Sequence, residues 1–440
     1  MTIFYAIKRL IKKIVPSSLI DRYHFFWALF GALLYRFPSR KIKVIGVTGT
    51  NGKTTTTEMI AKIFEEAGYK TALLNSIRFK IGKKEKLNKM RMTMPGRFFI
   101  QRFLKKAVNA GCKFAILEVT SEGIKQYRHR FINFDTAVIT NLAPEHIEAH
   151  GGFENYKRTK GKLFQATKKV HVINLDDKNA DYFLQFQAER KYLYKIKNQK
   201  SKIKNKERIK ILEAKNYQSL PQGVRFFVNN EEFNLKLLGE FNVYNALAAI
   251  CVGLSQGIDL KTCKRALEKM KGIPGRMETV IKRPFEVIVD YAFTPNALRK
   301  VYETLIDSKL KSQNSKLICV LGACGGGRDK WKRPVLGELA AKYCNKIILT
   351  NEDPYDEDPN QILLEIKSGI PKEQIPMTNL VLDRRKAIRQ ALKMAKAGDV
   401  VVITGKGCES SICLAGGKQI PWDDRRVARE EFNNLRLNDQ

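Results

Sequence analysis

From Lys43 onward, short runs of apolar, β-branched residues alternate with longer stretches in which apolar residues recur at helical spacing. This alternation is typical of parallel βαβ units, in which helices cover both faces of a sheet. It predicts two sets of strands, at residues 44–47, 114–119, 136–141 and 170–175, and then at 287–291, 317–321, 346–350 and 400–404. We therefore expect two consecutive α/β domains.

The boundary between these domains is marked by the sequence Gly-Ile-Pro-Gly at residues 272–275, where Gly and Pro interrupt a helical pattern before a new strand. This predicts domains at 43–274 and 275–440, preceded by a basic and aromatic leader at 1–42. Between residues 190 and 215 the chain is rich in Lys, and the alternation Lys195-Ile196-Lys197 predicts exposed hairpins.

Composition narrows the class of protein. The eight cysteines include no C-x-x-C pair, so neither a disulfide framework nor a zinc ribbon is indicated, and a cytoplasmic location fits best. The apolar run at 25–35 has about half of the roughly 20 residues that a membrane-spanning helix needs. No signal peptide is recognisable, because Pro16 and polar residues follow the basic start.

The formal net charge is +36, from 80 Lys and Arg against 44 Asp and Glu. Such a charge attracts polyanions, anionic membranes and phosphorylated small molecules alike. A solvated, Lys-rich surface accounts for much of it equally well. Because no helix-turn-helix, zinc finger or RNA-binding aromatic motif is present, we expect no nucleic-acid partner.

A glycine-containing loop follows the first strand of the central domain. The sequence reads Thr48-Gly49-Thr50-Asn51-Gly52-Lys53-Thr54-Thr55 and then becomes helical. A strand, glycine turn and helix in this order surround phosphates with backbone N–H groups, while the Lys reaches the terminal phosphates and the Thr holds Mg²⁺. The pattern G-x-x-x-x-G-K-[ST] would place its first Gly at Val47, so this is a variant phosphate loop. Together with the two sets of strands, this loop predicts a central P-loop-type ATPase domain with a parallel sheet, followed by a Rossmann-like α/β domain.

This loop resembles the nucleotide loop of the Mur ligase family, and later motifs match in the same order almost to the end of the chain. Glu118-Val119-Thr120-Ser121 is similar to the family's E-V-S-S, and residues 141–146 are similar to N-L-x-x-D-H. The resemblance implies Mg²⁺ ligands at Glu118, His146 and Lys160, the last as a carbamate, together with Thr54. It implies catalytic roles for Lys53, Lys160, His146 and Glu118.

Further motifs imply contacts with ATP in addition to the loop residues. Residues 239–245 resemble G-x-F-N-x-x-N, which implies adenine and ribose contacts at Asn242 and Asn245, although an Asn-capped helix is the simpler interpretation. Arg276 and Asp290 stand where the family places residues near the nucleotide. Phe293 replaces the His of the family's D-Y-A-H-T-P.

The resemblance also implies a set of substrate-binding residues: Thr93, Ser121, Arg128, Arg328, Asp329, Lys332, Arg333, Glu352, Asp353, Pro354, Tyr355, Gly405 and Glu409. Glu122 replaces a His of the family. Tyr355 stands where an Arg commonly receives the carboxylate of diaminopimelate, and a phenol cannot form a bidentate ion pair. The added amino acid is therefore left open between diaminopimelate, lysine and another diamine.

The implied activity is that of the tripeptide-forming (MurE) type: ATP- and Mg²⁺-dependent amide-bond formation on a muramyl-peptide carboxylate, through an acyl phosphate, in peptidoglycan precursor synthesis. Alternatives are a folylpolyglutamate- or cyanophycin-synthetase-like ligase, a ligase acting on a lipid-linked precursor, and a nucleic-acid-binding protein on a ligase scaffold. We expect a monomer.

The leader is the main departure from the family, which usually begins with a complete UDP-binding domain that cannot fit into 42 residues. The leader places Lys8, Arg9, Lys12 and Lys13 ahead of an aromatic segment around Phe25, Phe26, Trp27, Leu29 and Phe30. Cations and aromatic residues together suit an anionic lipid interface, so peripheral contact with the inner face of the membrane is one hypothesis. A helix packed on the ligase body is the other.

Overall fold

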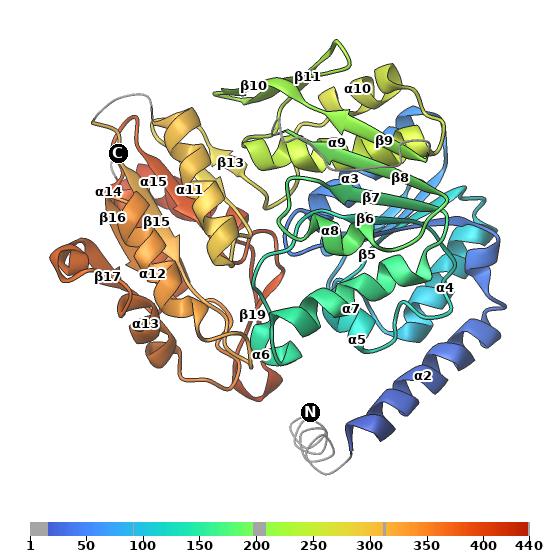
Figure 1. The fold of residues 1–440 in the computed structure, drawn as a ribbon. Coiled ribbons are helices and arrows are strands. Elements are labelled where there is room, and N and C mark those ends of the chain that lie inside the picture. Colours follow the sequence, from blue (N-terminus) through green and yellow to red (C-terminus); the bar gives the residue numbers. More distant parts are fainter. Residues whose placement is uncertain (1–15, 91, 197–207, 311–313, 439–440) are drawn as a thin grey trace.

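The computed structural model describes residues 16–90, 92–196, 208–310 and 314–438. The four leader cations at positions 8–13 lie outside this range. Figure 1 shows two α/β bodies side by side, the first built from residues up to about 270 and the second from the remainder. Helix α2 (Ser17–Leu34) lies along the lower edge of the first body. None of the described helices is long and apolar enough to cross a membrane.

The first body is built on a nine-stranded sheet in the order β4-β3-β2-β5-β1-β6-β7-β8-β9. Strands β2 and β5 to β9 run parallel to β1, and β3 and β4 form an antiparallel hairpin at one edge. The strands are β1 Lys43–Thr48, β2 Thr71–Leu74, β3 Arg78–Ile81, β4 Lys84–Leu87, β5 Phe114–Glu118, β6 Phe134–Ile139, β7 Val170–Asn174, β8 Arg190–Lys195 and β9 Ile209–Glu213. Because the chain crosses over to both sides of β1, the crevice beyond its carboxyl end is where such folds bind ligands.

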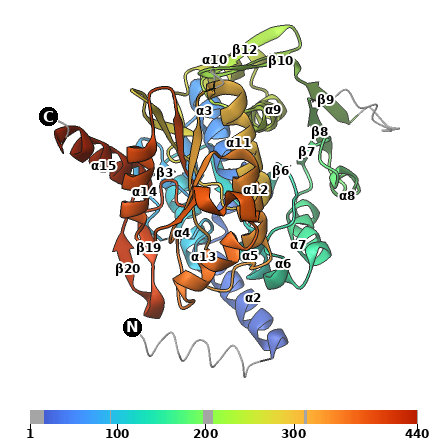
Figure 2. The same ribbon diagram turned by 90° about the vertical axis from the view of Figure 1, so that its left-hand side faces the viewer.

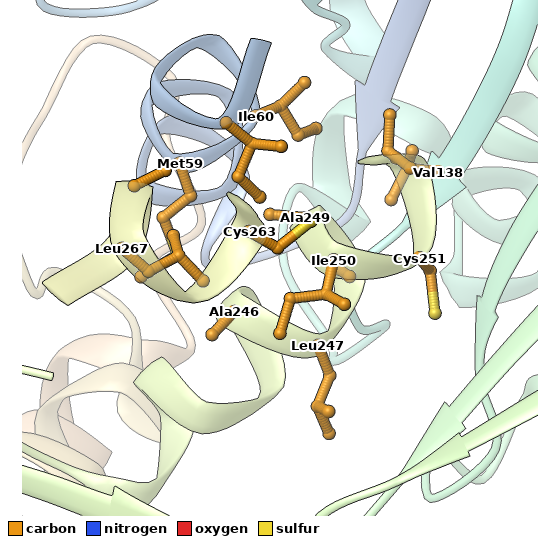
Figure 3. Packing of buried hydrophobic residues seen from close by; sticks show 14 of the residues in the cluster. Met59, Ile60, Val138, Ala246, Leu247, Ala249, Ile250, Cys251, Cys263 and Leu267 are labelled. Atoms are coloured by element: carbon orange, nitrogen blue, oxygen red, sulfur yellow. The ribbon is translucent and has the colours of Figure 1, made fainter. Parts of the chain in front are cut away.

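Helices cover both faces of this sheet, because its central strands are apolar on both sides. One face packs on α3 (Lys53–Glu66), α9 (Glu240–Ser255) and α10 (Leu260–Glu268). Figure 3 shows this packing, in which Met59 and Ile60 of α3 meet Ala249 and Ile250 of α9. The other face packs on α4 (Arg97–Asn109), α5 (Ser121–Lys125), α7 (Phe153–Ala166) and α8 (Ala180–Leu184).

The Lys-rich region differs from its prediction. Strand β8 pairs in parallel with β7 and β9, so the hairpin predicted from Lys195-Ile196-Lys197 is wrong where the structure describes it. The reason is burial, since Tyr192 and Tyr194 of β8 belong to the core. After β9, a separate antiparallel sheet leads into α9; its strands are β10 Lys215–Leu220, β11 Gly223–Val228 and β12 Glu231–Leu235.

The second body contains a six-stranded sheet in the order β13-β14-β18-β15-β16-β17, parallel except for β13. Its strands are β13 Glu278–Ile281, β14 Glu286–Val289, β15 Leu317–Leu321, β16 Lys346–Leu349, β17 Thr378–Leu380 and β18 Val400–Ile403. One face packs on α11 (Pro295–Lys309), α12 (Lys332–Tyr343) and α13 (Pro359–Lys367), and the other on α14 (Arg384–Met394) and α15 (Asp424–Asn438). Figure 2 shows α14 and α15 at the left of the view, on the other side of this body from α11 and α12.

Shorter elements complete the chain: η1 Pro38–Arg40, α6 Ile147–His150, η2 Lys372–Met377, η3 Ala415–Gly417, β19 Ser411–Cys413 and β20 Gln419–Pro421. The predicted α/β class with parallel sheets is confirmed, and a strand lies at or next to each of the eight predicted positions. The domain boundary at 274/275 stays a prediction.

Candidate functional site

A cavity of about 1540 Å³ lies between the two bodies. The first body lines it with the β1–α3 loop and with the segments that follow β5 and β6, and the second body lines it with the segments that follow β14 and β15. These are the carboxyl ends of parallel strands, where α/β folds collect ligand-binding residues. The two bodies touch across it, since Asn51 Nδ2 donates to Thr294 Oγ1 at 3.4 Å.

The loop between β1 and α3 has the backbone form of a phosphate cradle. Gly49 and Gly52 have φ of 145° and 83°, and a Cβ at Gly52 would collide with Asn245 Oδ1. Gly52 is the last residue before α3, so the unpaired N–H groups at the helix start point toward the cavity region. Lys53 Nζ donates to the carbonyl of Thr50 at 2.8 Å, which curls the side chain back over the loop.

The side chains of Thr54 and Glu118 are hydrogen-bonded to each other beside the phosphate loop. Thr54 Oγ1 donates to Glu118 Oε2 at 2.9 Å, and the backbone N–H of Ser76 donates to the same oxygen at 3.0 Å. Glu118 is buried at the end of β5, directly beside β1 in the sheet. A hydroxyl and a carboxylate beside a phosphate cradle are oxygen ligands of the kind Mg²⁺ prefers, so these residues fit the metal. Among the described residues no group of three His, Cys, Asp or Glu side chains is placed to bind a metal ion without other ligands.

Lys160 and His146 complete the predicted catalytic set. Lys160 is buried on α7, where Nζ donates to the carbonyl of Gly49 at 2.9 Å and lies 4.6 Å from the ring centroid of Tyr156. Burial, reinforced by the nearby Lys53, holds the pKa of Lys160 well below its usual value. Burial and the neighbouring cations also lower the pKa of His146 to about 2, which keeps its imidazole neutral.

The predicted nucleotide contacts come together on the far side of the loop. Asn245 Nδ2 donates to Asn242 Oδ1 at 3.0 Å, and both side chains line the cavity at the start of α9. Arg276 lies over the ring of Tyr291 at 4.4 Å. Asp290 accepts the backbone N–H of Met277 at 2.7 Å, so its carboxylate fixes the turn that carries Arg276.

Six of the thirteen predicted substrate residues line the cavity. They are Thr93, Ser121, Arg128, Arg328, Asp329 and Tyr355. Thr93 is hydrogen-bonded to Ser76 at 2.8 Å, which links it to Glu118. The ring of Tyr355 packs against Gly326. The backbone of Tyr355 is left-handed, with a φ of 52°. Asp329 accepts the N–H groups of Ile147 and Glu148 from α6, at 3.2 and 3.1 Å, and so joins the two bodies.

The other seven are not among the residues that line the cavity: Lys332, Arg333, Glu352, Asp353, Pro354, Gly405 and Glu409. Lys332 forms a buried ion pair with Glu145 at 2.8 Å, and Arg333 pairs with Glu357 at 2.8 Å. Asp353 pairs with Lys406 at 2.8 Å. The charges of Lys332, Arg333 and Asp353 are therefore paired within the protein. The role of all seven residues in substrate binding stays a prediction.

Two residues of the site were missed as candidates. Ser76 follows β2, and nothing in its local sequence distinguishes it from other serines. Asn141 belongs to the motif at 141–146, but the sequence does not reveal its role. Its Oδ1 accepts the N–H of Asn51 at 3.1 Å, and its Nδ2 donates to the carbonyl of Asn51 at 3.0 Å. Asn141 therefore fixes the backbone of the phosphate loop at Asn51.

A phosphate loop facing a second α/β body across a deep cavity defines a nucleotide-dependent enzyme of two domains. Family models confirm this class: the Mur ligase middle domain matches residues 47–253, and the Mur ligase, glutamate ligase domain matches residues 275–407. The chain belongs to the Mur ligase family, whose members are ATP-dependent ligases that form amide bonds.

Relatives agree with this assignment. The UDP-N-acetylmuramoyl-L-alanyl-D-glutamate–2,6-diaminopimelate ligase of Syntrophomonas wolfei is 38% identical over 408 residues, which cover 92% of this chain and 81% of that protein. The UDP-N-acetylmuramyl-tripeptide synthetase of a Roseiflexus species is 35% identical over 446 residues, covering 96% and 84%.

Solved structures show the same fold. A UDP-N-acetylmuramoyl-L-alanyl-D-glutamate–2,6-diaminopimelate ligase is 31% identical with a TM-score of 0.60, covering 90% of this chain and 79% of that one. A folylpolyglutamate synthase from Mycobacterium tuberculosis reaches a TM-score of 0.69 at 17% identity, covering 91% and 95%. At that identity the second likeness concerns the fold alone.

Proposed function

We propose that this protein joins an amino acid to the carboxylate of a muramyl peptide at the expense of ATP, as the names of its relatives say of them. The observation that carries the proposal is the cavity itself. Lys53 and the Thr54–Glu118 pair stand at one part of its wall, and the guanidinium groups of Arg128 and Arg328 stand at others. One cavity therefore offers a place for a triphosphate and for an acidic acceptor.

The reaction would proceed in two displacements. A carboxylate oxygen of the acceptor attacks the γ-phosphorus of ATP, so that an acyl phosphate forms and ADP leaves. The amine of the incoming amino acid then attacks the acyl carbon, loses a proton, and releases inorganic phosphate. Lys53 and the loop N–H groups hold the phosphates in line, and positioning with charge neutralisation supplies most of the rate enhancement in such transfers.

Magnesium fits this arrangement through Thr54, Glu118 and His146, and when bound it would neutralise charge on the phosphates. The neutral imidazole of His146 leaves a nitrogen lone pair available for such a contact. Because burial favours the neutral amine of Lys160, that amine is suited to react with carbon dioxide and become a carbamate ligand. Carbon-13 NMR in labelled bicarbonate should give a carbamate signal that is lost in Lys160→Met.

The incoming amino acid is proposed to be a diamine, with diaminopimelate as the first candidate and lysine as the second. Its carboxylate end would approach Arg328 and Tyr355, which line the cavity from the second body. The acceptor is proposed to carry UDP, and a lipid-linked precursor is the alternative.

The test is ligation with UDP-MurNAc-dipeptide, ATP, Mg²⁺ and a panel of amino acids, with products identified by mass spectrometry. We expect one amide product per ADP released. Lys53→Ala should lower the rate about a hundredfold or more, because it removes a cation from the transferring phosphoryl group. Lys62→Ala on the exposed side of the same helix is the matched control and should leave the rate unchanged. Equal rates for the parent and Lys53→Ala would reject the proposed function.

A further inference from the structure

Helix α2 has an unusual distribution of side chains. Its buried residues are the small ones, Ala28, Gly31 and Ala32, and Gly31 approaches the ring of Phe98 on α4 at 3.6 Å. Phe25 packs on Phe131 of the first body, and the rings of Trp27 and Phe30 contact Phe98 with one side. Six large apolar or aromatic residues are nevertheless between 40% and 63% exposed: Tyr23, Phe26, Trp27, Phe30, Leu33 and Leu34. A helix that is stabilised only by packing on its own domain shows the opposite distribution.

The outward residues form one continuous face. Their spacing of three, four and seven positions places them on one side of a helix of 3.6 residues per turn. From Tyr23 to Leu34 no residue is acidic, Lys or Arg. An apolar face of this extent marks an interaction site, because large exposed apolar patches are rare on proteins without a partner.

The charges around this face select the kind of partner. Residues 16–42 contain four Lys or Arg and one Asp, and α4, on which α2 packs, contains four Lys or Arg and no acid. Together the two segments have eight cations against one anion, within a chain of net charge +36. An apolar face on a segment that is rich in cations and nearly free of acids is suited to the interface of an anionic bilayer, where rings enter the headgroup region and cations meet phosphates.

Helix α2 is linked to the cavity through one residue of α4. Arg97 of α4 contacts His24 of α2, and its Nε donates at 3.0 Å to the carbonyl of Gln126, which lines the cavity together with Arg128. Within the described part of the chain, neither Arg97 nor Arg128 forms an ion pair with a carboxylate. A surface that binds α2 would therefore lie close to the acceptor-binding end of the proposed site.

We propose that the exposed face of α2 docks this protein on an anionic lipid membrane, with the helix lying in the plane of the interface. This inference goes beyond the proposed function and does not depend on it, because membrane docking requires neither ATP nor an acceptor. None of the described helices is suited to span a bilayer, so the contact is peripheral.

The test is co-sedimentation of the full chain with vesicles of phosphatidylcholine alone and of phosphatidylcholine mixed equally with phosphatidylglycerol. We expect pelleting with the mixed vesicles that weakens as salt rises, and little pelleting with phosphatidylcholine. The double variant Phe26→Ser/Phe30→Ser should lower the partition coefficient about tenfold or more. Leu364→Ser/Leu437→Ser, which removes two exposed apolar residues from the second body, is the matched control and should bind as the parent does.

A second readout reports on the helix directly. Trp27 should shift its fluorescence to shorter wavelength when mixed vesicles are added, and Trp27→Phe should abolish the shift. Equal pelleting of the parent and the Phe26/Phe30 variant would overturn the proposal. So would a concentration-dependent dimer in solution that the same variant abolishes without any vesicle binding, since the face would then bind a second copy of this chain.

Discussion

At the scale of single residues, Tyr355 is the position where this chain departs most informatively from its family. Its ring lies against Gly326 and beside the cavity. Because Tyr355 already has a left-handed φ of 52°, another non-glycine residue meets the same backbone strain there. An Arg at this position would offer a fork of N–H donors to a second carboxylate of the amino acid.

We therefore predict that Tyr355→Arg raises kcat/KM for diaminopimelate relative to lysine by about tenfold. A tenfold change is about 1.4 kcal/mol, close to the lower end of what one hydrogen bond to a charged group contributes. Steady-state rates of ADP release with each amino acid measure this ratio. Tyr355→Phe, which removes the hydroxyl without adding a cation, should leave the ratio within about twofold. No change with Arg would show that the carboxylate binds elsewhere.

Single residues also show which parts of the site the sequence predicts. The order of strand, glycine turn and helix predicted the backbone form of the loop at 48–55. Glu118 was predicted from the resemblance to the family's E-V-S-S motif, and its role as a metal ligand stays a prediction. Lys332 and Arg333 look equally suited to bind an anion, yet they pair with Glu145 and Glu357. A motif shows that a side chain is charged. It does not show whether that side chain pairs with a carboxylate of the protein or with a carboxylate of the substrate.

At the scale of elements, a buried ion pair joins α14 to α15 in the second body. Arg384 Nε and Nη2 donate to the two oxygens of Asp424 at 2.9 and 2.7 Å, and Nη2 also donates to the carbonyl of Thr404 after β18 at 2.7 Å. Both side chains are almost fully buried. Arg384 therefore joins two helices to the carboxyl edge of the sheet.

Asp424→Asn should destabilise the second body by about 3–5 kcal/mol, because it leaves the Arg384 charge buried without its partner. Urea unfolding followed by tryptophan fluorescence measures the change. Asp423→Asn, next to it but paired at the surface with Arg425, should cost less than about 1 kcal/mol. Equal losses in the two variants would contradict the role assigned to the buried pair.

Element prediction succeeded and failed for one reason. The central parallel strands are continuous apolar runs, so the sequence predicts them. Strand β4 (Lys84–Leu87) is exposed at every position and has no apolar face from which it could be predicted. Strand β8 lies inside the sheet between β7 and β9, and it was missed for a different reason, because the Lys-rich pattern concealed two buried tyrosines. Strands at sheet edges owe their structure to a neighbouring strand, which lies outside any local window of sequence.

At the scale of the whole molecule, buried imidazoles make stability depend on pH. Burial lowers the pKa of His129 to about 3 and that of His171 to about 4, so both are neutral in the folded protein. Unfolding lets them take up protons below about pH 6.5. Their contribution to stability is complete above that pH and falls as the pH decreases toward their folded values.

Between pH 7 and pH 5 each of these two groups should lower the free energy of unfolding by about 2 kcal/mol. His171→Gln, whose amide can still donate to the carbonyls of Phe164 and Thr167, should reduce the acid sensitivity by about that amount. Urea midpoints at the two pH values measure the difference. Identical pH dependence in the parent and the variant would contradict the assignment.

The central claim is that the two bodies close a cavity in which an acceptor carboxylate takes the γ-phosphoryl group of ATP. The most direct measurement uses an acceptor whose reacting carboxylate is labelled with oxygen-18, and mass spectrometry of the phosphate released during ligation. The account predicts one labelled oxygen in each phosphate, because the acyl oxygen leaves with phosphorus when the amine attacks. Unlabelled phosphate accompanying amide formation would contradict it.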